Sequence, residues 1–132
     1  MTKYAHSDLT SKIIGCAMRV HTKLGLGFPE KVYQNALIIE LKKENLFVEF
    51  EIEADVYYEM QWVGTRRLDL LVKKKVLVEL KAFGELEQRH INQILNYLNA
   101  FNLELGLLLN FGNEKLQFHR YFNKNYITRK PD

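Results

Sequence analysis

The chain has 132 residues, of which 47% are hydrophobic and 27% charged, a length that suits one ordinary domain and is too short for two self-sufficient cores. We therefore expect residues 1–132 to form a single domain. The content of 7 glycines and 2 prolines excludes collagen-like, low-complexity and disordered chains. The single cysteine, Cys16, excludes an intramolecular disulfide and a cysteine-based zinc site.

Charge and hydropathy limit the partners. No apolar run approaches the roughly 18 residues that span a bilayer, and the first ten residues lack the apolar core of a signal peptide, so we expect no membrane partner and a cytoplasmic location. The net charge of +3 permits a polyanionic partner without requiring one. A phosphate-binding patch and a solvated surface explain the basic clusters equally well; they are Lys73, Lys74 and Lys75, then Lys115, His119, Arg120, Lys124, Arg129 and Lys130.

Two helices are expected first. Apolar side chains at helical spacing predict the first from Ser7 or Asp8 to Gly25. The second is expected from Pro29, a residue favoured at the first helical position, to about Asn45.

Glu30 stands out in the second helix. A helical projection at about 100° per residue places it on the same stripe as Tyr33, Leu37 and Leu41. An acidic side chain is therefore expected to face inward. The alternative is an acid favoured in the first turn by the helix dipole.

From Leu46 onward the apolar residues alternate, which predicts strands. Four are expected before the next helix: Phe47 or Val48 to Ala54, Val56–Trp62, Arg66–Val72 and Val76–Phe83, with a turn at Val63–Gly64. The last two are nearly continuous in apolar residues, which is typical of strands covered on both faces.

A third helix and two more strands complete the chain. The helix is expected over 85–101, and the strands over 105–110 and 116–121. The fold class is thus α/β with a mixed sheet. The buried stripe of the helix is expected to be Ile91, Ile94, Leu95, Leu98 and Phe101.

Three ionisable residues, Asp69, Glu79 and Lys81, interrupt two strands that should be buried. Burying an unpaired carboxylate costs several kcal/mol, so such a placement needs a reason. If the turn is centred on Lys74, the register places Asp69 opposite Glu79. It also places Arg67 opposite Lys81, on the same face.

Directly opposed side chains in a sheet have Cβ atoms about 5 Å apart, a distance at which two carboxylates repel. A hard divalent ion such as Mg²⁺ would relieve the repulsion between Asp69 and Glu79. The alternative is a surface hairpin in which both acids form salt bridges with Arg67 and Lys81. The apolar neighbours of the two acids count against it, because an exposed hairpin would alternate more cleanly.

Five short motifs follow one another in the chain: GFPEKVY at 27–33, LDLLV at 68–72, VELKA at 78–82, QILNY at 93–97 and LLLNFG at 107–112. With them the chain resembles the GxxExxY family, which is placed in the PD-(D/E)XK nuclease superfamily. The resemblance extends from about Leu9 to Tyr121. It implies a restriction-endonuclease-like core, with a central mixed sheet flanked by helices.

The resemblance also implies roles for individual residues. Asp69 and Glu79 would be the metal-binding acids, with the Leu80 carbonyl as an extra ligand. Lys81 would be the catalytic lysine, and Glu30 would match the acid contributed by an early helix. Leu68 departs from the superfamily pattern, in which a proline often precedes the first acid.

Gln93 and Tyr97 resemble the QxxxY motif of exonuclease-like branches of the superfamily. They are four residues apart, so they share one helix face, at the flank of the expected buried stripe. They could border a cleft and bind substrate, or form a polar helix shoulder with a half-buried tyrosine.

The remaining reactive side chains receive no role. Cys16 lies on an apolar helix face and is expected to be a buried core thiol. The four histidines share no metal-ligand spacing and are expected to be incidental; they are His6, His21, His90 and His119.

The sequence thus predicts a Mg²⁺- or Mn²⁺-dependent nuclease that hydrolyses phosphodiester bonds in nucleic acid, expected to be DNA. The alternative is a non-catalytic module that retains the nuclease fold and binds nucleic acid or a protein. Because no segment remains for a target-recognition domain, we do not expect sequence-specific cleavage by this chain alone, and a homodimer or a partner protein could supply the specificity.

Overall fold

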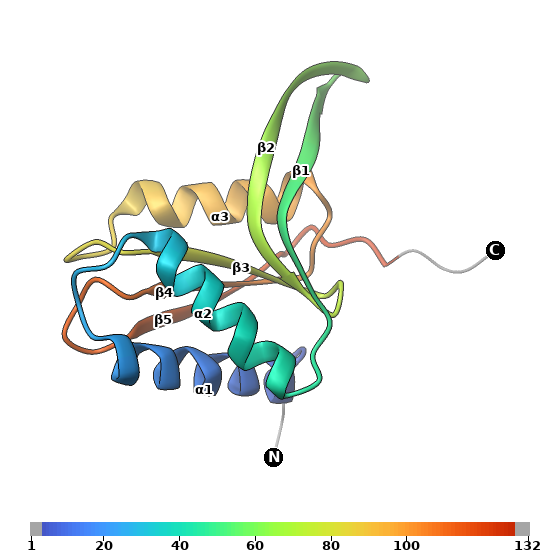
Figure 1. Ribbon diagram of the computed structural model, residues 1–132. Coiled ribbons are helices and arrows are strands. Elements are labelled where there is room, and N and C mark those ends of the chain that lie inside the picture. Colours follow the sequence, from blue (N-terminus) through green and yellow to red (C-terminus); the bar gives the residue numbers. More distant parts are fainter. Residues whose placement is uncertain (1–3, 129–132) are drawn as a thin grey trace.

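The computed structural model describes residues 4–128, and Arg129 and Lys130 of the predicted basic cluster lie outside these residues. Its described part forms one mixed sheet in the order β1-β2-β3-β4-β5, in which β3 and β4 are parallel and the other neighbours antiparallel (Figure 1). The predicted α/β fold with a mixed sheet is confirmed. The elements are α1 (Ser7–Leu24), α2 (Glu30–Lys43), β1 (Val48–Tyr58), β2 (Gln61–Val72), β3 (Val76–Lys81), α3 (Gln88–Ala100), β4 (Leu105–Asn110) and β5 (Gln117–Phe122).

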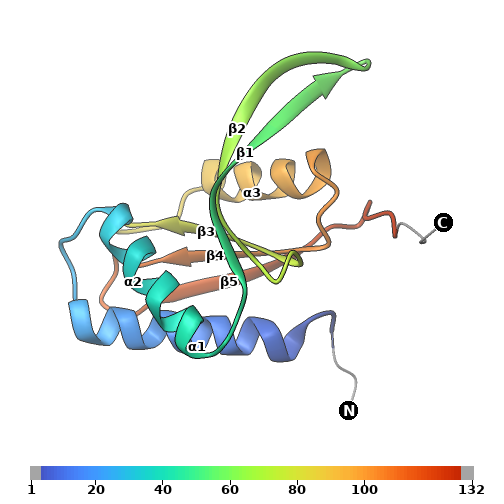
Figure 2. The ribbon, with the colours of Figure 1, turned by 45° about the vertical axis from the view of Figure 1, so that its right-hand side comes forward.

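Helices cover both faces of the sheet. Helices α1 and α2 lie on one face and α3 on the other (Figures 1 and 2), and each side has its own apolar cluster. Strands β3 and β4 lie between these layers and are buried almost throughout, as their continuous apolar sequences predict. Within residues 4–128, no helix has the length and apolar character that crossing a membrane requires.

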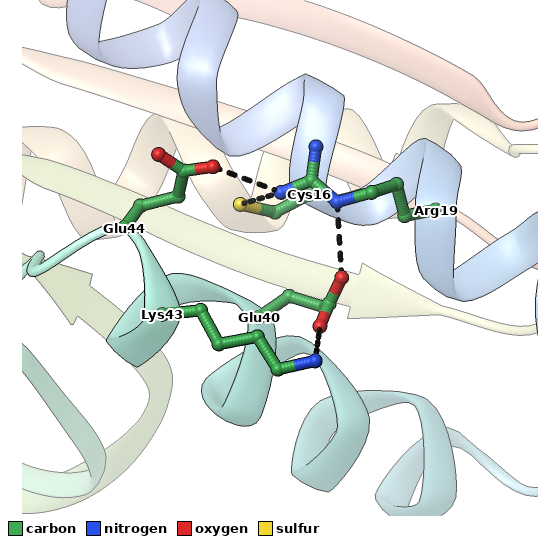
Figure 3. A network of polar contacts seen from close by, with 5 residues as sticks. All are labelled: Cys16, Arg19, Glu40, Lys43 and Glu44. Atoms are coloured by element: carbon green, nitrogen blue, oxygen red, sulfur yellow. Dashed lines mark hydrogen bonds and ion pairs between the residues drawn. The ribbon is translucent and has the colours of Figure 1, made fainter.

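A polar network joins α1 to α2 (Figure 3). Arg19 donates from Nε to Glu40 Oε1 at 3.0 Å and from Nη2 to Glu44 Oε1 at 3.2 Å, while Lys43 pairs with Glu40 Oε2 at 2.9 Å. Arg19 Nη2 also lies 3.2 Å from the Cys16 sulfur. Cys16 is fully buried, and burial raises the pKa of its thiol, so the expected core thiol is confirmed.

Between α2 and the turn at Lys73–Lys75 the chain forms two long strands, β1 and β2, where three short strands were expected. The hairpin turn lies at Glu59 and Met60, with φ of 48° and 65°. The predicted turn at Val63–Gly64 is wrong, because both residues lie inside β2. Two-residue turns with positive φ are usually marked by Asn-Gly or Asp-Gly, and here two ordinary side chains adopt that backbone without such a signal.

The outer part of this hairpin projects from the body of the molecule (Figures 1 and 2). We call residues 54–66 the arm. Its strands pair with each other, and β2 joins β3 only through its last residues, Leu70–Val72. Large apolar side chains are exposed near its tip, with Tyr57 62% and Met60 94% exposed.

Helix α3 begins at Gln88 and is turned slightly from its predicted orientation. Its buried residues are His90, Ile94, Tyr97 and Leu98. The expected burial of Leu95 is wrong, since that side chain is 40% exposed. This orientation of α3 is explained by Gly106 of β4: any larger residue would place its Cβ within 3.2 Å of the Ile94 and Leu98 side chains. The glycine lets these two side chains approach the sheet and leaves Leu95 at the helix edge.

The end of β3 is tied to the turn after β4 by Asn110, which is fully buried. Its Oδ1 accepts hydrogen bonds from the backbone N–H groups of Phe83 and Gly112, each at 3.0 Å. Its Nδ2 donates to Gln117 Oε1 at 2.8 Å. These bonds bring the Gly112 backbone so close to the segment after Lys81 that no side chain fits between them.

Replacing Gly112 by alanine should therefore lower the free energy of unfolding by about 2–3 kcal/mol, because its Cβ would overlap backbone atoms of Ala82 and Phe83. Gly84→Ala is the matched control: no atom lies within 4 Å of its added Cβ, so the change should stay within about 0.5 kcal/mol. Urea unfolding measures both. Equal stability of the two variants would contradict the close packing at Gly112.

Candidate active site

Strands β2 and β3 separate at Asp69 and Glu79. Their pairs are Val72 with Val76, Leu71 with Leu77 and Leu70 with Val78, which is the register expected for a turn centred on Lys74. Beyond Leu70 the paired ladder ends, and β2 continues only beside β1. The point of separation is therefore the position at which the next pair, Asp69 and Glu79, would stand.

The two acidic side chains take over the hydrogen bonds at this point. The Asp69 N–H donates to Glu79 Oε2 at 2.8 Å, and the Leu80 N–H donates to Asp69 Oδ2 at 2.8 Å. Each carboxylate thus binds a backbone amide of the opposite strand. The structure brings Asp69 and Glu79 together, as the register predicts.

The predicted opposition of Arg67 and Lys81 is wrong. Arg67 lies beside Glu53 of β1, and its Nη2 is 3.2 Å from Glu51 Oε1. The reason is the strand separation, since β2 has already left β3 when it reaches Arg67.

The acids are not part of a surface salt-bridge hairpin. Glu79 is 3% exposed and Asp69 is partly buried. Among residues 4–128, neither forms an ion pair within 4.0 Å. Burial and the neighbouring Asp69 raise the pKa of Glu79 to about 8, and burial raises the pKa of Asp69 above its usual range. Ionising both acids would therefore concentrate negative charge unfavourably at this point.

The GxxExxY motif builds the turn that leads to Glu30. Gly27 has φ of 102°, a backbone conformation that favours glycine. The Tyr33 hydroxyl donates to the Gly25 carbonyl at 2.6 Å and accepts from the Phe28 N–H at 3.3 Å. The ring of Tyr33 stacks on Phe111 at 4.7 Å. The motif thus fixes the start of α2 against the end of β4.

Glu30 is the first residue of α2. The other residues on its helix face, Tyr33, Leu37 and Leu41, are buried as predicted. Glu30 itself is exposed, so the expectation that it faces inward is wrong. The stripe reaches the end of the helix there, where no further layer covers it. Partial desolvation, followed by the charge of Asp69, raises the pKa of Glu30, and Lys81 opposes this rise. Its carboxyl is therefore electrostatically coupled to the acid pair.

Lys81, Gln93 and Tyr97 form a hydrogen-bonded chain. Lys81 Nζ donates to Gln93 Oε1 at 3.1 Å, and Gln93 Nε2 donates to the Tyr97 hydroxyl at 3.1 Å. Tyr97 is 8% exposed, and burial raises the pKa of its hydroxyl. The two α3 residues thus hold the lysine at the end of β3.

An open cavity of about 370 Å³ adjoins this chain, and its lining residues are Glu30, Lys81, Phe83, Arg89, His90 and Gln93. His90 was expected to be incidental, yet it lines the cavity that also receives Lys81. The signal that could have shown this is helical spacing. His90, Gln93 and Tyr97 stand at i, i+3 and i+7, which places them along one face of α3.

The donor set fits a small hard cation. Two buried carboxylates lie side by side, each with one oxygen bound to a backbone amide, and their mutual repulsion would be relieved by a positive ion. No set of three histidine, cysteine or acidic side chains within residues 4–128 is arranged to enclose a metal ion. Mg²⁺ suits such a site, because it accepts one or two carboxylates and keeps several waters.

The family model described as the PD-(D/E)XK nuclease superfamily matches residues 7–121. This match spans most of the chain, and the chain belongs to that superfamily. Asp69, Glu79 and Lys81 stand within the matched region. Membership of the GxxExxY family within it stays a prediction.

Among solved structures, the chain is similar to one titled "Crystal structure of SSO0001", with a TM-score of 0.58 and 19% identity. The match covers 71% of this chain and 50% of that one, so our chain spans about half the length of its structural relative. At this identity the likeness concerns the fold, and it supports the restriction-endonuclease-like architecture. A search of curated proteins found no match.

The acid pair should make the metal-free protein less stable as pH rises. The pKa of Glu79 is raised to about 8 from 4.5, so the folded state holds a proton that the unfolded state has lost between these values. The free energy of unfolding should therefore fall with increasing pH in this window, by at most about 1.4 kcal/mol per pH unit for one proton.

Glu79→Gln tests this, because its amide oxygen can still accept the Asp69 N–H. The variant should lose the pH dependence and be more stable than the wild type above pH 8. Chemical unfolding in EDTA from pH 5 to 9 measures both proteins. A variant destabilised at every pH would show that the charged pair supports the fold.

Proposed function

We propose that this protein is a metal-dependent nuclease that hydrolyses phosphodiester bonds in DNA. The observation that carries the proposal is the carboxylate pair at the separation of β2 and β3, with Lys81 two residues beyond Glu79 on β3. Membership of the nuclease superfamily supports it. The proposal treats residues 1–132 as one functional unit.

Asp69 and Glu79 would hold the ion, Mg²⁺ or Mn²⁺, together with the carbonyl of Leu80. The Leu80 N–H points toward Asp69, and in a strand the N–H and C=O of one residue point to the same side. The Lys81 carbonyl accepts from Phe111 on the opposite side, in keeping with this alternation. A bound divalent ion supplies Lewis-acid polarisation of the scissile phosphate and an activated water.

Lys81 would orient the attacking water and stabilise negative charge on the phosphate. One of its hydrogens is bound by Gln93 at 3.1 Å, which leaves two for these tasks. Gln93 and Tyr97 would act as substrate-binding residues and keep the ammonium group in place. Glu30, which is electrostatically coupled to Asp69 and Lys81, would complete the acidic site from α2.

A nuclease of this superfamily acts on nucleic acid, and DNA is the substrate we propose. A homodimer or a partner protein would supply sequence specificity, and a cytoplasmic location is part of the proposal. A chain that binds nucleic acid without cutting it would instead be the non-catalytic module.

Divalent metal should stabilise the folded protein. Mg²⁺ or Mn²⁺ at a hundredfold excess over its dissociation constant should add about 2.7 kcal/mol to the free energy of unfolding, visible as a higher melting temperature. Asp69→Asn should abolish the effect, whereas Asp55→Asn, on the exposed arm, should keep it. An undiminished metal response in Asp69→Asn would place the ion elsewhere.

Lys81→Ala should reduce DNA cleavage by about a hundredfold or more if the lysine assists proton transfer. Metal-induced stabilisation should persist, and binding should fall only slightly, because several basic groups share phosphate affinity. Lys42→Ala, an exposed lysine on the last turn of α2, is the charge-matched control. Cleavage assays with gel shifts at two salt concentrations separate these effects.

The two unfavourable results have different meanings. A Lys81→Ala protein that cuts as fast as the wild type would reject the role given to this lysine. Wild-type protein that binds DNA but cuts it with neither Mg²⁺ nor Mn²⁺ would favour the non-catalytic module.

A further inference from the structure

The cavity beside Lys81 adjoins the carboxylate pair and shares Glu30, Lys81 and Gln93 with the proposed active site. Neither Asp69 nor Glu79 lines it. Its walls come from the start of α2, the end of β3 with the segment that follows, and the first turns of α3. Most of its polar lining groups are hydrogen-bond donors or cations; Glu30 is the single acid among the lining residues.

His90 lines this cavity and carries one ring hydrogen-bond donor without a described partner. The Glu87 N–H donates to His90 Nδ1 at 3.0 Å, so Nδ1 is unprotonated and Nε2 carries the ring hydrogen. The residue is 4% exposed, and no described residue accepts a hydrogen bond from Nε2. Glu49 Oε1 is the single fully buried polar side-chain atom without a partner among residues 4–128, so Nε2 is not completely enclosed.

Arg89 adds a second donor group to the cavity lining, and its guanidinium packs on the Phe83 ring. The Phe83 ring lies 4.9 Å from the His90 ring, and the Arg89 guanidinium lies 5.4 Å from the Phe83 centroid. Arg89 uses Nε and Nη2 to bind Glu87 Oε1, which leaves Nη1 available. Burial, followed by the charges of Lys81 and Arg89, lowers the pKa of His90 and favours its neutral ring.

We propose that this cavity binds a phosphate group of the nucleic-acid strand, adjacent to the phosphate that is cut. His90 Nε2–H and the Arg89 guanidinium donate to its oxygens, with Lys81 between the two phosphates. Charge-assisted bonds from guanidinium to phosphate are among the stronger hydrogen bonds in proteins, and contacts to phosphates fix the position of a strand. The inference rests on the proposed function, because it assigns the substrate of that site a second contact.

Glu30 sets the orientation of this ligand. It lines the cavity from α2, and its carboxylate would repel an anion, so the phosphate would lie on the α3 side, near His90 and Arg89. The ligand chemistry is a phosphate oxyanion, which a strand offers either as an internal diester or as a terminal monoester.

The test is phosphate binding by the full chain in EDTA, without cleavage. Inorganic phosphate and the dinucleotide dTpdT are titrated into ¹⁵N-labelled protein, and the side-chain Nε2 resonance of His90 is followed by NMR. We expect a saturable shift with at least one probe. Saturation by dTpdT supports an internal diester, whereas saturation by inorganic phosphate alone supports a strand terminus.

Variants assign the shift to the cavity. Arg89→Gln and His90→Glu should each weaken phosphate binding at least fivefold. Glutamate at position 90 can still accept the Glu87 N–H, but it offers no hydrogen-bond donor to the phosphate. A backbone amide of the cavity, such as that of Phe83, reports binding to the His90 variant. Lys42→Gln, which removes one charge from an exposed site on α2, should bind like the wild type.

Three results would overturn the inference: no saturable shift with either probe, equal weakening by Arg89→Gln and Lys42→Gln, or undiminished binding by His90→Glu. Asp69→Asn distinguishes this inference from the nuclease function. That variant should bind the probes at least as tightly as the wild type, because Asp69 does not line the cavity and its replacement removes a nearby negative charge. Wild-type protein that binds phosphate but never cleaves would reject the nuclease proposal and leave the cavity assignment standing.

Discussion

Two carboxylates replace the backbone pairing where β2 leaves β3, and the rest of the site depends on this exchange. The bonds from Asp69 N–H to Glu79 and from Leu80 N–H to Asp69, both 2.8 Å, satisfy amides that the separation would otherwise leave without partners. They also hold both acids at the same place in the sheet. Because β3 continues beside β4 after this point, Lys81 is carried to the side chains of α3, and β2 is free to form the arm.

The acid pair is costly to the fold, and the surrounding core offsets the cost. Glu79 lies in a strand whose neighbours Val78 and Leu80 are buried, and burial together with Asp69 disfavours its ionised form. Apolar side chains of β3 and β4 pack against helices on both faces, which fixes the backbone that carries the acids. Charged side chains inside an otherwise well-packed, buried strand are typical of functional sites.

The sequence predicted those parts of the molecule that depend on local periodicity or on one short turn. The apolar runs located β3 and β4, and the turn at Lys74 placed Asp69 beside Glu79, since three ladder pairs transmit the register directly. Features that depend on long-range packing could not be predicted in this way, because Gly106 on β4 shifts the buried face of α3. The turn at Glu59 was also missed, since no glycine marks it. The orientation of His90 depends on a backbone N–H of Glu87, which side-chain spacing does not reveal.

The separation of the strands also divides the chain into regions of different local stability. The arm pairs only with itself, so its amides should exchange with deuterated solvent through local opening, whereas those of β3 and β4 should exchange only when larger units open. The amides of Asp69 and Leu80 stand at the boundary, and each is bonded to a carboxylate. Their exchange rates therefore depend on the ionic state of the acids, which makes two backbone amides natural reporters of whatever occupies the site.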